Sequence, residues 1–83
     1  MYQIILSRTA EKDLSKIDKE YKPHIFAALF DLRKDPYLGK KLKGKFQDCY
    51  SLRVGLYRII YKIYKRKLNI LVIRIGHRQG VYR

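Results

Sequence analysis

The twelve residues from 50 to 61, YSLRVGLYRIIY, constrain the fold most strongly, because apolar and polar residues alternate on both sides of one glycine. This pattern is typical of two antiparallel strands joined by a tight turn. If Gly55 and Leu56 form a two-residue turn of type II′, Arg53 lies directly opposite Arg58. Like charges that face each other across a sheet destabilise it, by up to about 1 kcal/mol. The pair therefore indicates an anionic ligand on this face of the hairpin.

The distribution of charge also indicates an anionic partner. The chain has 20 Lys and Arg residues against 7 Asp and Glu residues, a formal net charge of +13. All the acids lie at or before Asp48, and the rest of the chain carries only basic charges. Such uncompensated positive charge is typical of nucleic-acid binding. Charge for solubility alone is the other interpretation, but solubility does not require acids to be absent from one half.

Length and composition limit the class of protein. At 83 residues the chain has room for one hydrophobic core, so we expect a single domain over residues 1–83. The single cysteine, Cys49, has no partner for an intramolecular disulfide, and we expect a small core residue in a reducing compartment. No apolar run reaches the roughly 18 residues that span a membrane, and no signal peptide opens the chain. We therefore expect a cytoplasmic protein that does not bind membranes.

The first half of the chain predicts a strand and two helices. Residues 2–7 are expected to form a short strand. In the next segment Ala10, Leu14 and Ile17 recur at helical spacing, with Asp13 on the opposite side. A second helix between the two prolines of the chain completes a helical hairpin, because proline suits a first helical turn and ends a helix that reaches it.

The second half predicts a sheet. Residues 36–48 have no clear period and are expected to be a linker, whose lysines are either solvated or grip a phosphate. After the hairpin, residues 68–76 are apolar at nearly every position, which is typical of a strand buried on both faces in the middle of a sheet. The expected fold is α+β, of order β-α-α-β-β-β, with the helical hairpin packed on one face of a mostly antiparallel sheet.

Alternation also assigns the faces of the hairpin. The face that should cover the helices carries Tyr50, Leu52, Val54, Tyr57, Ile59, Tyr61 and Ile63. The other face carries Ser51, Arg53, Arg58, Ile60, Lys62 and Tyr64. The face of Arg74 depends on the register of the last strand. If Arg74 stands beside Arg58, three arginines converge on one surface.

A cluster of arginines that holds a phosphate also stabilises the negative charge that builds up when that phosphate is attacked. RNA cleavage of this kind needs no metal, because the 2′-hydroxyl is the nucleophile, but it needs a base and an acid. With two distant histidines, one cysteine and no carboxylate after Asp48, we expect no metal and no cofactor. His77, beside Arg78, is either catalytic or structural. Tyr82 either stacks on a base or packs.

At the level of whole segments, KKLKGKFQDCYSLRVGLYRIIY and VIRIGHRQGVYR resemble the RelE/ParE superfamily of bacterial and archaeal toxins, in particular its RelE branch. The likeness covers nearly the whole chain. It implies a ribosome-dependent endoribonuclease that enters the A site, lined by 16S rRNA, cuts the mRNA codon there and leaves a 2′,3′-cyclic phosphate. It also implies an acidic, RelB-like antitoxin that binds the toxin in a hetero-oligomer and silences it.

The resemblance also implies roles for individual residues. Arg58 matches the arginine that stabilises the transition state, and Arg78 matches the arginine at the leaving group. Tyr82 matches the tyrosine that stacks on the substrate. Arg53 and Ser51 depart from the family pattern, because both stand where the family has catalytic lysines.

These departures leave the general base open. Arginine stays protonated and is a poor base, so the candidates are His77, a lysine of residues 40–45 and Tyr82. Besides Ser51, the candidates for substrate binding are Lys41, Lys43, Lys45, Lys62, Arg74 and Arg83.

Two other functions fit the same sequence. A ParE-like toxin shares the fold but inhibits DNA gyrase and cuts no RNA, so expressing cells would keep intact mRNA and accumulate double-strand DNA breaks. A basic RNA-binding module without catalytic activity would lose affinity steeply with salt and leave RNA uncut.

Overall fold

The computed structural model describes residues 1–77. Its helices are α1 (Arg8–Ser15) and α2 (Lys22–Lys34), with two short 3-10 helices, η1 (Pro36–Leu38) and η2 (Gly44–Phe46). Its strands are β1 (Gln3–Leu6), β2 (Lys40–Lys41), β3 (Tyr50–Val54), β4 (Tyr57–Tyr64) and β5 (Asn69–His77). None of the helices in this part of the chain is long and apolar enough to cross a membrane.

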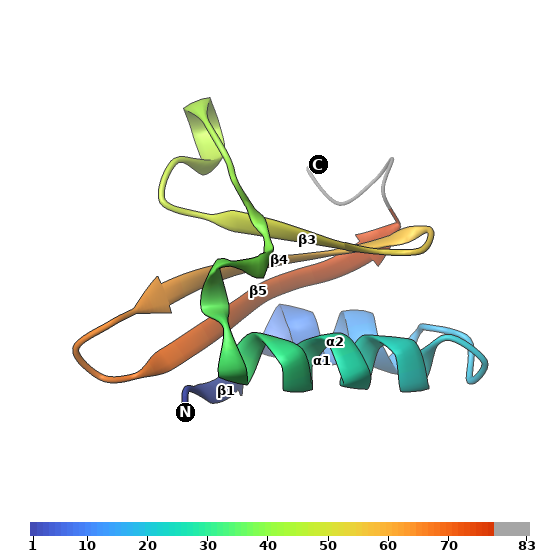
Figure 1. Cartoon of the computed structure of the whole chain (residues 1–83). Helices are drawn as coiled ribbons and strands as arrows, with labels where there is room; N and C mark the ends of the chain where they lie inside the picture. The colour runs from blue at the N-terminus through green and yellow to red at the C-terminus, as the bar shows by residue number, and fades with distance from the viewer. Residues whose placement is uncertain (78–83) are drawn as a thin grey trace.

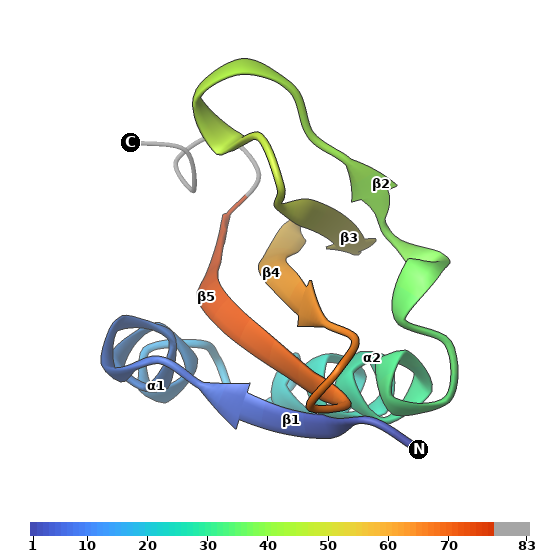
Figure 2. The same ribbon diagram turned by 90° about the vertical axis from the view of Figure 1, so that its left-hand side faces the viewer.

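The strands of residues 1–77 form one sheet in the order β1-β5-β4-β3-β2. β1 runs parallel to β5, and the other neighbouring pairs are antiparallel. Figures 1 and 2 show α1 and α2 together on one face of the sheet, whereas β2 lies at the edge farthest from β1. The predicted α+β fold is therefore confirmed. β5 lies between β1 and β4, so it is an interior strand as its apolar sequence predicted, although its residues are buried mainly on one face.

The segment from 36 to 48 differs from the prediction. We expected a linker without regular structure, but this segment contains η1, β2 and η2. β2 pairs with β3 over only two residues, Lys40 with Ser51 and Lys41 with Tyr50. A strand this short produces no period in a sequence, because alternation needs at least four residues to be recognised.

The β3–β4 hairpin has the predicted register. Arg53 pairs with Arg58, directly across the two strands. Gly55 has a φ of +59°, whereas Leu56 is not among the residues with positive φ. A positive φ at the first central residue alone fits the predicted type II′ turn.

The predicted apolar face of the hairpin packs against the helices. Ile59 and Tyr61 of β4 are fully buried in the same cluster as Ile25 and Leu32 of α2. Tyr50, Leu52, Val54, Tyr57 and Ile63 pack around this cluster while keeping part of their surface exposed. The opposite face of the hairpin is thereby left to Ser51 and the two arginines.

Where β1 ends, α1 lies alongside the next part of β5. The ladder between the two strands ends at the pair Leu6 and Val72. The Ser7 N–H donates to the carbonyl of Val72 at 2.9 Å, and the Ser7 hydroxyl donates to the carbonyl of Ile73 at 2.8 Å. The same hydroxyl oxygen accepts from the Ala10 N–H at 3.0 Å, so it also caps the helix. One serine therefore joins the start of α1 to β5.

Asp13 continues this contact, contrary to the sequence prediction. We placed its side chain on the polar side of the helix, but only 14% of it is exposed. Its carboxylate accepts from the Ile75 N–H at 2.9 Å and from Nε of Arg74 at 2.9 Å. Asp13 follows Ala10 by three residues and precedes Ile17 by four, so it lies on the side of α1 that faces β5, whereas Glu11 and Lys12 are exposed.

The convergence of three arginines does not occur. β5 carries one extra residue, Ile73, where Ile60 pairs with Arg74 and the next residue, Tyr61, pairs with Val72. With this bulge Gly76 lies opposite Arg58, and Arg74 pairs with Ile60, two residues further along β4. The guanidinium of Arg74 is held by Asp13 instead.

We expect Asp13→Ala to lower the free energy of unfolding by about 1–3 kcal/mol, because the Ile75 N–H loses its acceptor in a partly buried position. Asp13→Asn keeps an acceptor oxygen and should be less destabilising. Urea denaturation measures both, with Asp31→Ala at an exposed position of α2 as the control. An equal loss of stability for Asp13→Ala and Asp31→Ala would contradict the structural role of Asp13.

Candidate nucleic-acid interface

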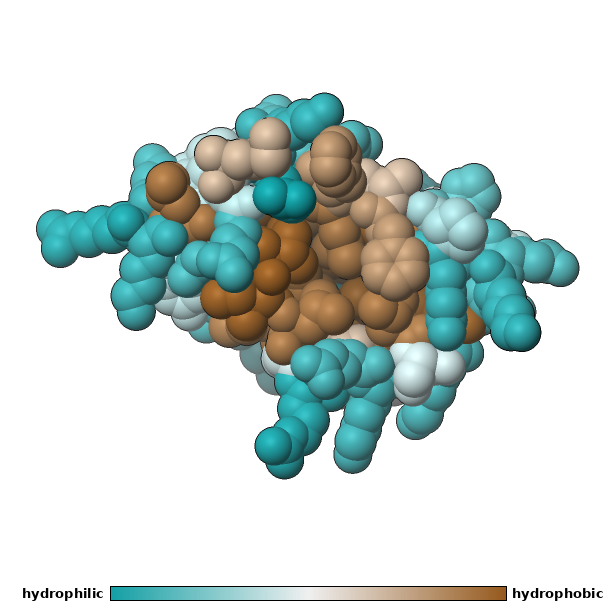
Figure 3. Space-filling view, turned by 90° about the horizontal axis from the view of Figure 1, so that it is seen from below, coloured by the Kyte–Doolittle hydropathy of each residue, from teal (hydrophilic) through white to brown (hydrophobic). Residues whose placement is uncertain are grey.

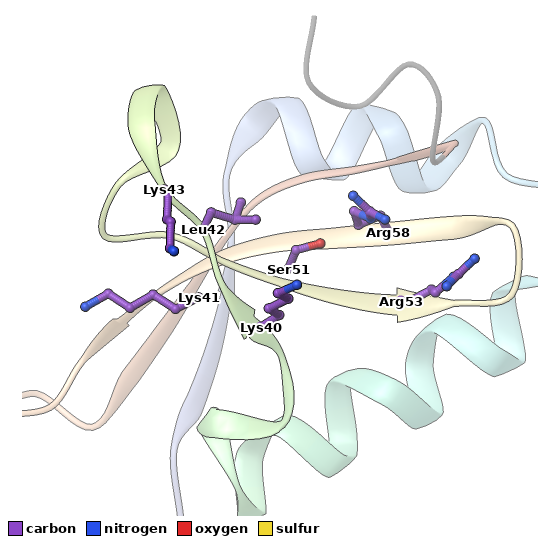
Figure 4. Close-up of a pocket in the computed structure, with 7 residues that line it drawn as sticks. All are labelled: Lys40, Lys41, Leu42, Lys43, Ser51, Arg53 and Arg58. Carbon is purple, nitrogen blue, oxygen red and sulfur yellow. The ribbon is translucent and has the colours of Figure 1, made fainter.

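A cavity of about 530 Å³ lies on the face of the sheet opposite the helices, beside β2. The described residues that line it are Lys40, Lys41, Leu42, Lys43, Ser51, Arg53 and Arg58 (Figure 4). Five of these seven side chains carry a positive charge, and none carries a negative one. The lining therefore suits an anion with several oxygen atoms, such as a phosphodiester.

Strand pairing brings the polar residues of the cavity together. Arg53 and Ser51 lie two residues apart on β3 and so share a face. Arg58 on one side and Lys40 on the other are their cross-strand partners, and residues paired in an antiparallel ladder also share a face. Three adjacent strands thus present cations to one cavity.

Gly76 keeps space beside Arg58. It is the residue of β5 that pairs with Arg58, so no side chain of β5 lies directly beside the guanidinium on this face. A larger residue at this point would cover the arginine, since cross-strand neighbours on one face lie about 5 Å apart.

The position of β2 depends on the hydroxyl group of Tyr61. This side chain is fully buried, and its hydroxyl donates to the carbonyl of Pro36 at 2.7 Å. The same oxygen accepts from the Gly39 N–H at 3.0 Å. The two bonds tie the segment between α2 and β2 to the middle of the sheet, one residue before Lys40.

Gly39 allows this close approach because it has no side chain. A Cβ at this position would lie 2.5 Å from the Tyr61 hydroxyl and 2.9 Å from the carbonyl oxygen of Ser51. The φ of Gly39 is −80°, which any residue adopts, so the requirement for glycine is one of space.

Burial raises the pKa of Tyr61 to about 12, because a charged phenolate would be poorly solvated there. The ordinary value is about 10, so the unfolded chain loses this proton before the folded chain does. The stabilisation from the neutral hydroxyl is therefore complete below about pH 10 and is lost as the pH rises towards 12.

We expect Tyr61→Phe to lower the free energy of unfolding by about 1–3 kcal/mol at pH 8, because the Gly39 N–H loses its acceptor. The difference from wild type should shrink at pH 11, since only the wild-type unfolded state gains from ionisation of this group. Denaturant titrations at both pH values measure this. Tyr64→Phe, at an exposed position of the same strand, should show neither effect. A pH-independent cost of Tyr61→Phe would contradict the raised pKa.

A small second core lies beside the cavity on the same face of the sheet and shares Leu42 with its lining. Cys49 and Ile60 are buried there, and Leu42, Phe46 and Ile73 pack against them. Burial raises the pKa of the Cys49 thiol, although nearby Lys62 partly opposes this. The thiol is thus held in its neutral form, and the prediction that Cys49 is a core residue is confirmed.

Several of the predicted site residues come together in the cavity: Lys41, Lys43, Ser51, Arg53 and Arg58. Lys45, which lies in η2, and Lys62 do not line it. Arg74 is bound to Asp13. The predicted residues Arg78, Tyr82 and Arg83 lie outside the described part of the chain.

His77 lies apart from the arginines. It pairs with Tyr57, and the centroids of the two rings are 6.1 Å apart. Tyr57 packs against the core on the helix side, so His77 belongs to that face and lines a separate cavity of about 190 Å³. The structure therefore does not bring His77 to Arg53 and Arg58.

Sequence reasoning missed Lys40 and Leu42 as cavity residues. Lys40 was considered only as one lysine of a basic linker, because nothing in the sequence distinguishes it from its neighbours. Its place follows from pairing with Ser51, which no local pattern predicts. Within residues 1–77 no three His, Cys, Asp or Glu side chains are grouped as a metal site requires.

Comparison with known proteins agrees with this architecture. Residues 4–82 match a family model described as the ParE toxin of the type II toxin–antitoxin system parDE. Toxin RelG of Mycobacterium tuberculosis is 32% identical over 88 aligned positions, covering 99% of this chain and 97% of that protein. The structure of the toxin–antitoxin complex RelBE2 from the same organism matches with a TM-score of 0.77 and 31% identity, over 93% of this chain and 98% of that chain.

The isolated Escherichia coli RelE toxin has the same fold, with a TM-score of 0.82 at 24% identity, over 93% of this chain and 84% of that chain. The helical hairpin on a five-stranded sheet that residues 1–77 form is thus the fold of a small toxin of this family. The chain belongs to the ParE toxin family of type II toxin–antitoxin systems and is a RelE-like member of the RelE/ParE superfamily.

Proposed function

We propose that this toxin is a ribosome-dependent endoribonuclease that cuts mRNA in the ribosomal A site. The single observation that carries the proposal is the pairing of Arg53 with Arg58 inside a cavity that contains only neutral and positively charged side chains among its described residues. Opposed arginines reduce the stability of a hairpin unless an anion lies between them. A phosphodiester of single-stranded RNA supplies that anion.

The cavity fits the charge changes of RNA cleavage. Attack by the 2′-oxygen on phosphorus adds negative charge to the non-bridging oxygens, and guanidinium groups stabilise this charge with directed hydrogen bonds. Arg58 is half-buried, so its charge is less screened by water than that of the exposed Arg53. We propose that Arg58 stabilises the transition state and that Arg53 binds the phosphate. Arg78 at the leaving group and Tyr82 at the base remain proposals from the family resemblance.

The remaining basic charge suits the ribosome as the place of action. From Cys49 onward the chain has no acid, so this half, which contributes Ser51, Arg53 and Arg58 to the cavity, attracts polyanions over a wide surface. Ribosomal RNA around the A site offers many phosphates, and the messenger codon there is single-stranded. Binding that depends on many phosphate contacts weakens steeply with salt.

We expect Arg58→Ala to reduce mRNA cleavage by about 10²–10³-fold, because it removes a donor to the developing negative charge. The fold should persist, since the substitution also removes a like-charge pair. Mapping of mRNA 5′ ends after brief induction measures the effect. Arg66→Ala, in the exposed turn after β4, is the matched control and should cut like wild type.

The same mapping distinguishes the other functions. Cuts that persist in Arg58→Ala would remove this residue from the site. Intact messages together with double-strand DNA breaks would favour gyrase inhibition, which the ParE description of the matching family makes the second candidate. If expression causes no cuts and no growth arrest, the remaining function is that of a binding module.

We also propose an antitoxin as the protein partner, as in the RelBE2 complex. Figure 3 shows an apolar patch in the middle of the helix side, surrounded by hydrophilic residues. Phe26 and Phe30 of α2 are 53% and 48% exposed, and exposed apolar patches mark protein interfaces. An antitoxin with an apolar helix face and acidic residues would cover the patch and reach the basic cavity.

We expect the antitoxin to protect Arg53 and Arg58 from arginine-specific labelling in the purified complex, because acidic side chains would occupy the cavity in place of RNA. Arg66 should be labelled equally in the free and the bound toxin, since it lies in the exposed turn between β4 and β5, at the end of β4 away from Arg58. Mass spectrometry of the labelled peptides gives both values. Unchanged labelling of Arg53 and Arg58 on binding would rule out this mode of silencing.

A further inference from the structure

We infer that Lys40 is the residue that protonates the leaving 5′-oxygen in the proposed cleavage, an inference that rests on the proposed function. No sequence pattern singled out this lysine. The inference depends on the chemistry that the other cavity residues lack and on the position that β2 gives to Lys40.

The reaction needs one group that can release a proton. As the O2′–P bond forms and the P–O5′ bond breaks, the 2′-hydroxyl proton passes to water and the 5′-oxygen takes up a proton. The products are a 2′,3′-cyclic phosphate and a 5′-hydroxyl, so atoms and charge balance. A positioned acid accelerates such a step by about 10²–10⁴-fold.

Most of the described cavity residues cannot act as this acid. A guanidinium group does not act as a proton donor in proteins, so Arg53 and Arg58 supply charge but not a proton. Leu42 is apolar, and the hydroxyl of Ser51 is no stronger an acid than the alcohol that leaves. The lysines are the remaining proton donors among these residues, and a lysine is an ammonium ion at neutral pH.

Among the lysines, the backbone directs Lys40 toward the arginines. Lys40 is the cross-strand partner of Ser51, and Ser51 shares its face of β3 with Arg53. Figure 4 shows the side chains of Lys40 and Ser51 between the two arginines and the loop that follows β2. The N–H of Gly39, the residue directly before Lys40, donates to the buried Tyr61 hydroxyl, and Gly39 has no space for a side chain. The backbone at Lys40 is therefore held by the buried core.

The side chains of Lys41 and Lys43 are directed less well toward the two arginines than that of Lys40. Lys41 pairs with Tyr50, which packs against the core on the helix side, and in Figure 4 its side chain points away from the arginines. Lys41 also lines a different cavity, with Tyr37 and Lys65. Lys43 follows Leu42, whose side chain packs into the second core, and in an extended chain neighbouring side chains point to opposite sides.

The experiment compares cleavage of two synthetic mRNAs on programmed ribosomes under single-turnover conditions. One mRNA has ordinary oxygen at the scissile bond, and the other has sulfur in place of the bridging 5′-oxygen. A thiolate leaves without being protonated, so the second substrate does not need the acid. The proteins are wild type, Lys40→Ala and Lys40→Arg, with Lys19→Ala between the helices as the control for lost surface charge.

We expect both Lys40 variants to cut the oxygen substrate about 10²-fold or more slowly than wild type. Both should cut the sulfur substrate within a few-fold of the wild-type rate, and Lys19→Ala should match wild type on both substrates. Thermal unfolding of each variant shows whether the fold is intact. Lys40→Arg is decisive, because it keeps the positive charge and loses the transferable proton.

Four results would overturn the inference. A wild-type rate for Lys40→Arg on oxygen would show that charge alone suffices, and equal slowing on both substrates would assign Lys40 to binding. A wild-type rate for Lys40→Ala beside an inactive Arg58→Ala would remove Lys40 from the reaction and leave the proposed function standing. Failure of the wild-type toxin to cut either mRNA would overturn the proposed function and this inference together.

Discussion

The hydroxyl group of Tyr61 holds the site together. It lies in the buried middle of β4, where it bonds to the carbonyl of Pro36 and to the N–H of Gly39. These two bonds fix the path of the chain from α2 into β2, and β2 brings Lys40 beside Ser51. The position of the cavity residue Lys40 therefore depends on hydrogen bonds made by a side chain of the core. A buried polar group with satisfied hydrogen bonds determines where exposed charged residues lie.

The sheet separates stability from function by its two faces. The helix side carries the continuous apolar cluster of β4, β5 and α2. Among residues 1–77 the other side has a small second core around Cys49 and Ile60, and the cavity beside it is lined by cations. Opposed arginines on this side destabilise the hairpin, but the buried side chains of the same strands offset that cost. The arrangement fits a protein whose ligand supplies the missing negative charge.

The edge of β5 explains one sequence prediction that was wrong and one that was left open. Asp13 was placed on the polar side of its helix and the face of Arg74 was not assigned, yet the two side chains bind each other. One extra residue in β5, Ile73, sets the register in which Arg74 pairs with Ile60 and Gly76 pairs with Arg58. Helical and strand periods describe each segment alone. They contain no information about a bulge or about the helix that lies beside a strand edge, so these positions could not be predicted.

The sequence by itself determined the α+β fold, the hairpin register with Arg53 opposite Arg58, and the basic character of the open face. These features follow from alternation, from a glycine with positive φ and from the distribution of acids, all of which are local or compositional. Only the tertiary structure decided that β2 exists, that Lys40 joins the cavity and that His77 lies on the other face. The physical reason is that these positions depend on contacts between distant segments, above all the bonds of Tyr61 to Pro36 and Gly39.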